Sequence, residues 1–174
     1  MAIKLIITST RPTRVADGVA AAVAPLLAEG SGREVEIVDL REVALPSLDE
    51  PQMPKLGDYQ LEHTKAWAAL IGGADAIVWL TPEYNGFFTA AAKNAIDCLY
   101  QEWVGKPMGI VGYGFGGAGR AIPALSTLLS NVEADVVGDV KLPFGNHFGP
   151  EGLAAAVLVD EHADAIRALG TKLA

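Results

Sequence analysis

The 174-residue sequence contains a single cysteine, Cys98, and three histidines. One cysteine cannot form an internal disulfide, and His63, His147 and His162 show no metal-ligand spacing with it, so we expect neither a disulfide framework nor a metal site. Basic residues are also few, since 13 Lys and Arg stand against 21 Asp and Glu, a net charge of −8. Phosphate neutralisation requires clustered Lys and Arg, and no basic run occurs, which argues against a nucleic-acid partner.

Long apolar runs are missing as well. None approaches the about 20 apolar residues that a membrane span requires, so no membrane partner is expected. The apolar N-terminal run is too short for a signal peptide and has no small-residue cleavage site, which favours a cytoplasmic protein. Yet 51% of the residues are hydrophobic and 20% are charged, the opposite of a disordered composition. We expect residues 1–174 to form a single domain with its own core.

Apolar, β-branched runs alternate along the chain with segments of helical periodicity. The expected strands are Ile3–Ile7, Val35–Val38, Ala76–Leu80, Met108–Val111 and Asp135–Val140. The expected helices are Val15–Ala28, Gln60–Ile71, Ala90–Leu99, Ala121–Leu129 and Glu161–Leu169. Near-continuous apolar strands are typical of a parallel sheet with helices on both faces, so the pattern predicts an α/β three-layer sandwich. Two Pro- and Gly-rich stretches, Leu45–Asp58 and Pro143–Gly152, are expected to be irregular loops, and either can border a site.

The loop after the first expected strand has the residues of an anion site. It reads Thr8-Ser9-Thr10-Arg11-Pro12-Thr13-Arg14 and enters a helix near Val15. Helix N–H groups, hydroxyls and guanidinium groups all bind phosphate oxygens. The loop has neither the lysine of a Walker A loop nor a G-x-G-x-x-G fingerprint. The alternative interpretation is a capped helix with two solvated arginines.

The loop after the third expected strand reads Pro82-Glu83-Tyr84-Asn85-Gly86. Pro82 favours an extended backbone, whereas Asn85 and Gly86 tolerate left-handed conformations that turn peptide groups toward a ligand. Such a loop can contact a flat heterocycle through its main chain. The alternative is a tight turn that packs Tyr84 and Phe87 at a subunit interface.

The loop after the fourth expected strand contains G-x-G-x-x-G as Gly112, Gly114 and Gly117. It follows a strand and precedes a helix, and Asp135 and Asp139 lie about 20 residues on, as a dinucleotide fingerprint requires. A fingerprint normally opens the first βαβ unit, however, and this one opens the fourth. Glycines here also suit a loop that covers a flat ring, and the sequence leaves both interpretations open.

Together the three loops indicate a mononucleotide with a planar ring, which is FMN. In a flavodoxin-like sandwich, a five-stranded parallel sheet of order 2-1-3-4-5, FMN lies at the switch between strands one and three. We therefore expect this fold here. The candidate phosphate residues are Ser9, Thr10, Arg11, Arg14, Val15 and Ala16. The candidate ring residues are Pro82, Glu83, Tyr84, Asn85, Gly86, Tyr113, Gly114, Phe115, Gly116 and Gly117.

These motifs, together with Lys93-Asn94-Ala95-Ile96-Asp97, resemble the NADPH-dependent FMN reductase family over roughly residues 3–145. The resemblance implies non-covalent FMN, a homodimer or homotetramer, and electron transfer from NADPH or NADH to flavins, quinones, azo dyes or metal oxyanions. It also implies that Ser9, Arg11 and the turn through Arg14 hold the phosphate. Many members have Ser or Thr where Arg14 stands, so rearranged phosphate contacts are expected here.

The function expected from these observations is that of an FMN-dependent NAD(P)H oxidoreductase that reduces a flavin, quinone or similar small acceptor by a ping-pong mechanism. The cofactor carries the chemistry, so no catalytic acid or base is expected. Three alternatives stay open. A flavodoxin-type electron carrier would use its acidic surface to dock on a basic partner. A dehydrogenase would bind a dinucleotide at Gly112–Gly117, and a third possibility is a domain that kept the fold and lost the flavin.

Overall fold

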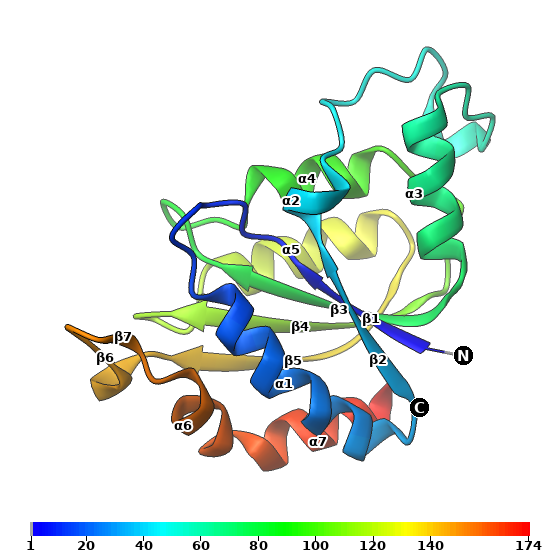
Figure 1. Cartoon of the computed structure of the whole chain (residues 1–174). Helices are drawn as coiled ribbons and strands as arrows, with labels where there is room; N and C mark the ends of the chain where they lie inside the picture. The colour runs from blue at the N-terminus through cyan, green and yellow to red at the C-terminus, as the bar shows by residue number, and fades with distance from the viewer. Residues whose placement is uncertain (1) are drawn as a thin grey trace.

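The computed structural model describes residues 2–174, and its centre is a parallel sheet of five strands in the order β2-β1-β3-β4-β5 (Figure 1). This confirms the expected flavodoxin-like architecture and strand order. The strands are β1 (Ala2–Ile7), β2 (Glu34–Asp39), β3 (Ala74–Pro82), β4 (Pro107–Gly114) and β5 (Asp135–Pro143). The chain leaves β1 toward β2 on one side and then crosses to β3 on the other. The switch in strand order therefore lies between β1 and β3.

Burial explains why the central strands are the most hydrophobic. Nearly every residue of β1, β3 and β4 is buried, because helices cover both faces of the sheet. The outer strands β2 and β5 have many exposed or half-buried residues, as sheet edges do. Strong apolar runs therefore predicted β1, β3 and β4. The weaker apolar run at β5 predicted a strand that ends at Val140, and this was too short, because the strand continues to Pro143.

Two groups of helices cover the two faces (Figure 1). On one face lie α1 (Ala16–Ser31), α6 (Ala155–Asp160) and α7 (Ala163–Lys172), which share a core cluster with the sheet. On the other lie α3 (Glu62–Gly72), α4 (Ala90–Asp97) and α5 (Ala121–Asn131), with the short α2 (Leu40–Val43) nearby. None of the helices within residues 2–174 is long and apolar enough to cross a membrane.

Three tryptophans, Trp67 on α3, Trp79 on β3 and Trp103 after α4, pack together on one face of the sheet. The Trp103 ring lies 6.3 Å from the Trp67 ring and 5.9 Å from the Trp79 ring, and all three side chains are buried. Their indole N–H groups are satisfied: Trp67 donates to Ala95 O at 2.9 Å and Trp103 donates to Ile96 O at 3.0 Å. This cluster fixes α4 against β3 and so places the loop between them, residues 83–89.

Both stretches expected to be irregular contain short regular pieces, and in this respect the expectation was wrong. Residues 143–152 hold the 3-10 turn η2 (Gly145–His147) and a small antiparallel ladder of β6 (Phe148–Gly149) with β7 (Gly152–Leu153). Gly145 and Gly152 have φ angles of 49° and 93°, which close these turns. Helix α6 was missed because six residues are too few to show a period.

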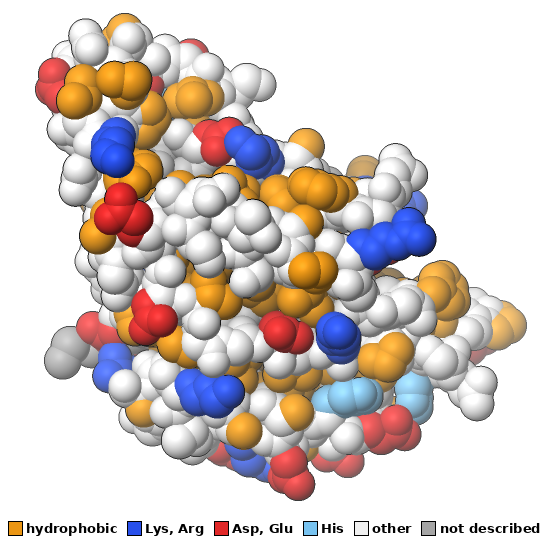
Figure 2. Space-filling view, turned by 180° about the vertical axis from the view of Figure 1, so that it is seen from behind, with side chains coloured by type: hydrophobic (Ala, Val, Ile, Leu, Met, Phe, Trp, Pro, Cys, Tyr) orange, Lys and Arg blue, Asp and Glu red, His pale blue; other side chains and the backbone are white. Residues whose placement is uncertain are grey.

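Residues 45–61 form an arm that projects from the α3 side of the molecule (Figure 1). It contains the 3-10 turn η1 (Pro54–Leu56) and exposes Leu48, Met53 and Leu56. The space-filling view shows hydrophobic side chains gathered on this projection (Figure 2). The arm is attached to α4 through Asn94, whose side chain accepts from Leu48 N and donates to Pro46 O.

Candidate active site

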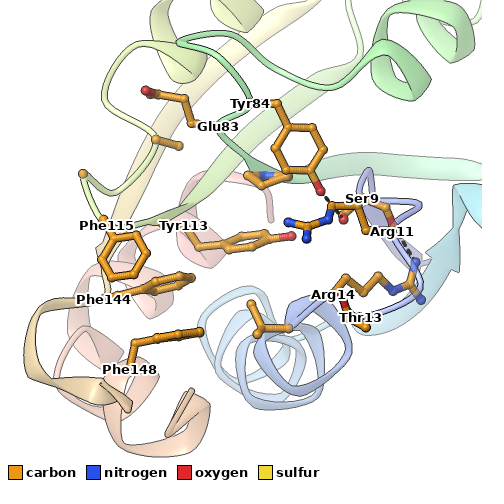
Figure 3. Close-up of a pocket in the computed structure, with 15 residues that line it drawn as sticks. Ser9, Arg11, Thr13, Arg14, Glu83, Tyr84, Tyr113, Phe115, Phe144 and Phe148 are labelled. Carbon is orange, nitrogen blue, oxygen red and sulfur yellow. Dashed lines mark hydrogen bonds between the residues drawn. The ribbon is translucent and has the colours of Figure 1, made fainter. Parts of the chain in front are cut away.

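A cavity of about 530 Å³ opens at the carboxyl ends of β1, β3 and β4, beside the switch in strand order (Figure 3). Its size is typical of small-molecule sites, and its place is where open α/β sheets bind ligands. The lining residues are Ser9, Arg11, Thr13, Arg14, Val15, Pro82, Glu83, Tyr84, Tyr113, Gly114, Phe115, Gly116, Ala118, Phe144 and Phe148.

One end of the cavity is suited to an anion. Helix α1 begins there after Val15 without any side-chain cap, which leaves its first N–H groups open to a ligand. The exposed guanidinium of Arg11 lines the same end and has no hydrogen-bond or ion-pair partner among the described residues. A turn closed by the Arg14 N to Arg11 O bond of 3.3 Å precedes the helix. An unpaired cation beside open helix N–H groups fits a phosphate.

Arg14 has a different environment from Arg11. Its guanidinium donates to Asp39 Oδ1 at 2.6 Å, to Asp17 Oδ2 at 2.9 Å and to Ser9 O at 2.6 Å. The side chains of Arg14 and Asp39 are only 2% and 9% exposed. The hydrogen bond from Arg14 lowers the pKa of Asp39 below its usual value, and Asp39 raises the pKa of Arg14. The geometry thus makes Arg14 a brace between the loop and the end of β2.

Hydroxyl groups connect the first loop to its neighbours. Ser9 Oγ lies 2.7 Å from the Tyr84 hydroxyl, which closes a bridge between the loops after β1 and β3. Thr8 donates to Leu80 O at 3.0 Å, and Thr89 donates to Thr8 O at 3.0 Å. The Tyr113 phenol lines the floor of the cavity, and burial raises its pKa, so the group is neutral at physiological pH.

The loop after β3 is a two-residue hairpin. Asn85 and Gly86 have φ angles of 53° and 80°, and Tyr84 and Phe87 exchange backbone hydrogen bonds of 2.9 and 3.1 Å across them. This is the conformation for which an Asn-Gly pair is favoured. It directs Tyr84 into the cavity and leaves the two turn residues outside the lining. Sequence reasoning expected all of these residues to face the ring, and the structure brings only the flank of the turn to the cavity.

Glu83 connects the same loop to α5. Its Oε2 accepts hydrogen bonds from Arg120 N at 2.8 Å and from Ala121 N at 3.3 Å. The first helical N–H groups of α5 are therefore satisfied by a carboxylate from another loop, which the positive end of the helix dipole also stabilises.

The glycine loop differs from a dinucleotide fingerprint. Gly112 lies inside β4, paired with Lys141, instead of in the turn after the strand. A Cβ atom there would lie 2.7 Å from Ile122 and 2.8 Å from Ala118, so Gly112 permits close packing of α5 on the strand. The turn itself begins at Gly114, where the Gly117 N to Gly114 O bond of 3.0 Å closes it.

Some predicted residues line the cavity and others do not. Those that line it are Ser9, Arg11, Arg14, Val15, Pro82, Glu83, Tyr84, Tyr113, Gly114, Phe115 and Gly116. Those outside the lining are Thr10, Ala16, Asn85, Gly86 and Gly117. Thr10 instead lines a smaller cavity of about 220 Å³ beside α2 and α4.

Sequence reasoning missed four lining residues, Thr13, Ala118, Phe144 and Phe148. The only signal for the two phenylalanines was the Gly- and Pro-rich stretch at 143–152, which marked a possible border of a site. Thr13 and Ala118 lie within the first and third loops but carry no distinctive chemistry in the sequence.

Comparison with known proteins identifies the family to which the chain belongs. The family described as NADPH-dependent FMN reductase matches residues 1–149. The NAD(P)H-dependent FMN reductase of Saccharomyces cerevisiae is 32% identical over 172 residues, which cover 91% of this chain and 90% of that protein. Its counterpart in Schizosaccharomyces pombe is 44% identical over 119 residues, which cover 67% of this chain and 60% of that longer protein.

Solved structures share the fold. The flavoenzyme NAD(P)H:(acceptor) oxidoreductase FerB from Paracoccus denitrificans superposes with a TM-score of 0.68 at 24% identity, covering 98% of this chain and 97% of its own. An azoreductase from Bacillus anthracis has a TM-score of 0.63 at 15% identity and covers 99% of both chains. The fold, the cavity at the strand switch and the family match agree, and the chain belongs to the NADPH-dependent FMN reductase family, oxidoreductases that use FMN and take electrons from NAD(P)H.

Proposed function

We propose that the cavity holds FMN non-covalently, with the phosphate at the start of α1 and the ring between the loops after β3 and β4. The observation that carries this proposal is the unpaired Arg11 guanidinium beside the uncapped N-terminus of α1. In this assignment Ser9, Arg11 and the N–H groups at Val15 and Ala16 bind the phosphate. Arg14 positions Ser9 through its carbonyl oxygen instead of binding the phosphate itself.

The proposed ring contacts come from the two neighbouring loops. Pro82, Glu83 and Tyr84 provide one edge, and the Asn85-Gly86 turn holds that edge in place. Tyr113, Gly114, Phe115 and Gly116 provide the opposite side, and Gly117 closes the turn through its bond to Gly114 O. Main-chain groups at both edges suit the polar rim of a flavin ring.

The reaction we propose is NAD(P)H + H⁺ + acceptor → NAD(P)⁺ + reduced acceptor, where the acceptor is a flavin, a quinone or a similar small molecule. FMN, when bound, supplies a site that accepts a hydride equivalent and returns two electrons. The chain binds, orients and shields the reactants. Glu83, the only carboxylate among the described residues that line the cavity, is engaged at α5, and we therefore propose that the protons exchange with solvent. We propose that donor and acceptor occupy this cavity in turn, which gives a ping-pong mechanism.

The proposal is tested by visible absorption. The protein is incubated with excess FMN, desalted and then mixed anaerobically with NADPH or NADH. Retention of the flavin band and its bleaching by either nucleotide is the expected result. A retained band that neither nucleotide bleaches would instead favour an electron carrier, and loss of the band at every FMN concentration would contradict flavin binding at this cavity.

We further propose that the chain assembles as a homodimer or homotetramer. Support comes from large hydrophobic side chains that the single chain leaves exposed, namely Leu48, Met53 and Leu56 on the arm and Phe87 at the hairpin after β3. Size-exclusion chromatography with light scattering should give a mass of two or four chains. A mass of 18.2 kDa would contradict the proposal.

A further inference from the structure

A column of aromatic rings runs along one wall of the cavity from its floor to its mouth (Figure 3). Tyr113 stacks on Phe144 with ring centroids 6.2 Å apart, and Phe144 stacks on Phe148 at 5.5 Å with the planes only 11° apart. The exposed fraction rises along the column, from 3% to 7% to 42%. Phe115 stands edge-on to both Phe144 and Phe148, at 5.4 and 5.5 Å, and is 75% exposed.

Backbone and side-chain contacts hold the column in place. Phe144 N donates to Gly114 O at 2.9 Å, which ties the base of the column to the end of β4. Phe148 lies on β6, which pairs with β7, and the preceding His147 ring lies 3.0 Å from Glu161 Oε2 at the end of α6. A wall that is ordered before a ligand arrives costs little conformational entropy when the ligand binds.

The four side chains of the column carry no charge, and this limits the kind of ligand that the column can bind. The cations that line the cavity, Arg11 and Arg14, belong to the loop before α1, on the other side of Tyr113 in Figure 3. A nicotinamide dinucleotide carries a diphosphate, which binds to cations or to helix N-terminal N–H groups, and the aromatic side chains of the column offer neither. Phenyl side chains without polar groups bind a planar apolar ring most favourably, because the ring can stack against them or meet them edge-on. Such a ring would also cover the exposed apolar surface of Phe115 and Phe148.

We propose that Phe144 and Phe148, next to the Phe115 that borders the proposed flavin position, form a subsite for the second ring of a fused-ring quinone and select such acceptors over single-ring ones. This inference rests on the proposed function, in which a quinone gains two electrons and two protons, one hydride equivalent from NAD(P)H and one proton from solvent, to become the hydroquinone. In this proposal the second ring of a naphthoquinone contacts Phe144 and Phe148 while its quinone ring takes up the electrons. A benzoquinone has no ring to place there.

The test compares Phe148→Ala with a matched control, Val157→Ala, which removes an exposed apolar side chain from α6 outside the cavity lining. Oxidised FMN-loaded protein is titrated with 1,4-naphthoquinone, which binds without turnover, and KM values are measured for 1,4-naphthoquinone, benzoquinone and ferricyanide. We expect an about three- to tenfold rise in the Kd and KM of naphthoquinone in Phe148→Ala, the loss of one aromatic pair. The control and the other two acceptors should not change.

Three results would overturn the inference. An unchanged naphthoquinone Kd would show that the column makes no contact with the acceptor. A raised KM for NADPH with an unchanged naphthoquinone Kd would assign the column to the donor, and a raised FMN Kd would assign it to the flavin. Phe148→Leu, which keeps apolar volume, replaces the alanine variant if that variant does not fold. Failure of NADPH to reduce the wild-type protein would contradict the proposed function, whereas the titration still reports on the column.

Discussion

Replacing Arg14 with methionine tests whether this residue braces the loop or binds phosphate. The substitution keeps much of the side-chain length but leaves the buried carboxylate of Asp39 without its main partner and releases Ser9 O. Breaking a buried ion pair by removing one partner costs about 3 kcal/mol or more in unfolding free energy. Displacement of Ser9 from a charged ligand costs about 1.5–3 kcal/mol, which corresponds to an about 10- to 100-fold rise in FMN Kd.

Two further variants separate the alternatives. Arg11→Met removes a guanidinium that pairs with none of residues 2–174, so the unfolding free energy without FMN should stay within about 0.5 kcal/mol of the wild type while FMN affinity falls. Adding Asp39→Asn to Arg14→Met removes the uncompensated charge, so we expect the loss of stability to shrink to about 1 kcal/mol. Urea unfolding without FMN and fluorescence titration with FMN measure the two quantities.

If Arg14 braces the loop, Arg14→Met should lose much of its unfolding free energy without FMN, and the double variant with Asp39→Asn should recover most of that loss. If Arg14→Met weakens FMN binding as much as Arg11→Met does and leaves unfolding without FMN unchanged, Arg14 is a direct phosphate ligand and our interpretation of its geometry is wrong. If the double variant is no more stable than Arg14→Met, the charge of Asp39 is not the cause of the loss.

Three other substitutions have defined outcomes. Because Arg14 lowers the pKa of Asp39 in the folded state, the stability that this carboxylate adds is complete above its unfolded pKa of about 3.9 and is lost as pH falls toward the lower folded value. The difference in unfolding free energy between wild type and Asp39→Asn, measured with urea, should therefore be constant from pH 7 to 5 and smaller at pH 3. A difference that stays constant down to pH 3 would contradict this assignment. Gly112→Ala places a Cβ within 2.8 Å of buried side chains and should lower the unfolding free energy by about 1–3 kcal/mol in thermal or urea denaturation. An unchanged unfolding free energy would show that α5 does not need a glycine at this position. Tyr84→Phe removes the hydroxyl that meets Ser9 and should cost about 1 kcal/mol of stability without FMN, and no loss would show that the bridge is not stabilising.

The sequence predicted the sheet well because its signal is local. Each central strand is a continuous apolar run bounded by turn residues, and the helices between the strands have long periodic faces. The order 2-1-3-4-5 followed from the position of the phosphate loop after the first strand and the ring loops after the third and fourth. Both the order and the family assignment are confirmed.

What the sequence left out depends on tertiary contacts. Asp39 is 25 residues from Arg14, and the two meet only because β2 pairs with β1 and ends beside the same loop. Two arginines in one loop therefore look equivalent in the sequence and differ in the structure. Phe144 and Phe148 join the site because β5 continues to Pro143, beside the end of β4, whereas the sequence predicted that this strand ends at Val140.

The double hydrogen bond from α5 to Glu83 has a kinetic consequence. The loop after β3 and the glycine loop that leads into α5 face each other across the cavity, and one carboxylate fastens them together. An outward movement of one loop away from the other requires that Glu83 first loses these hydrogen bonds. We therefore expect the two loops to move together, and the release of a cofactor held between them to depend on the opening of the Glu83 hydrogen bonds.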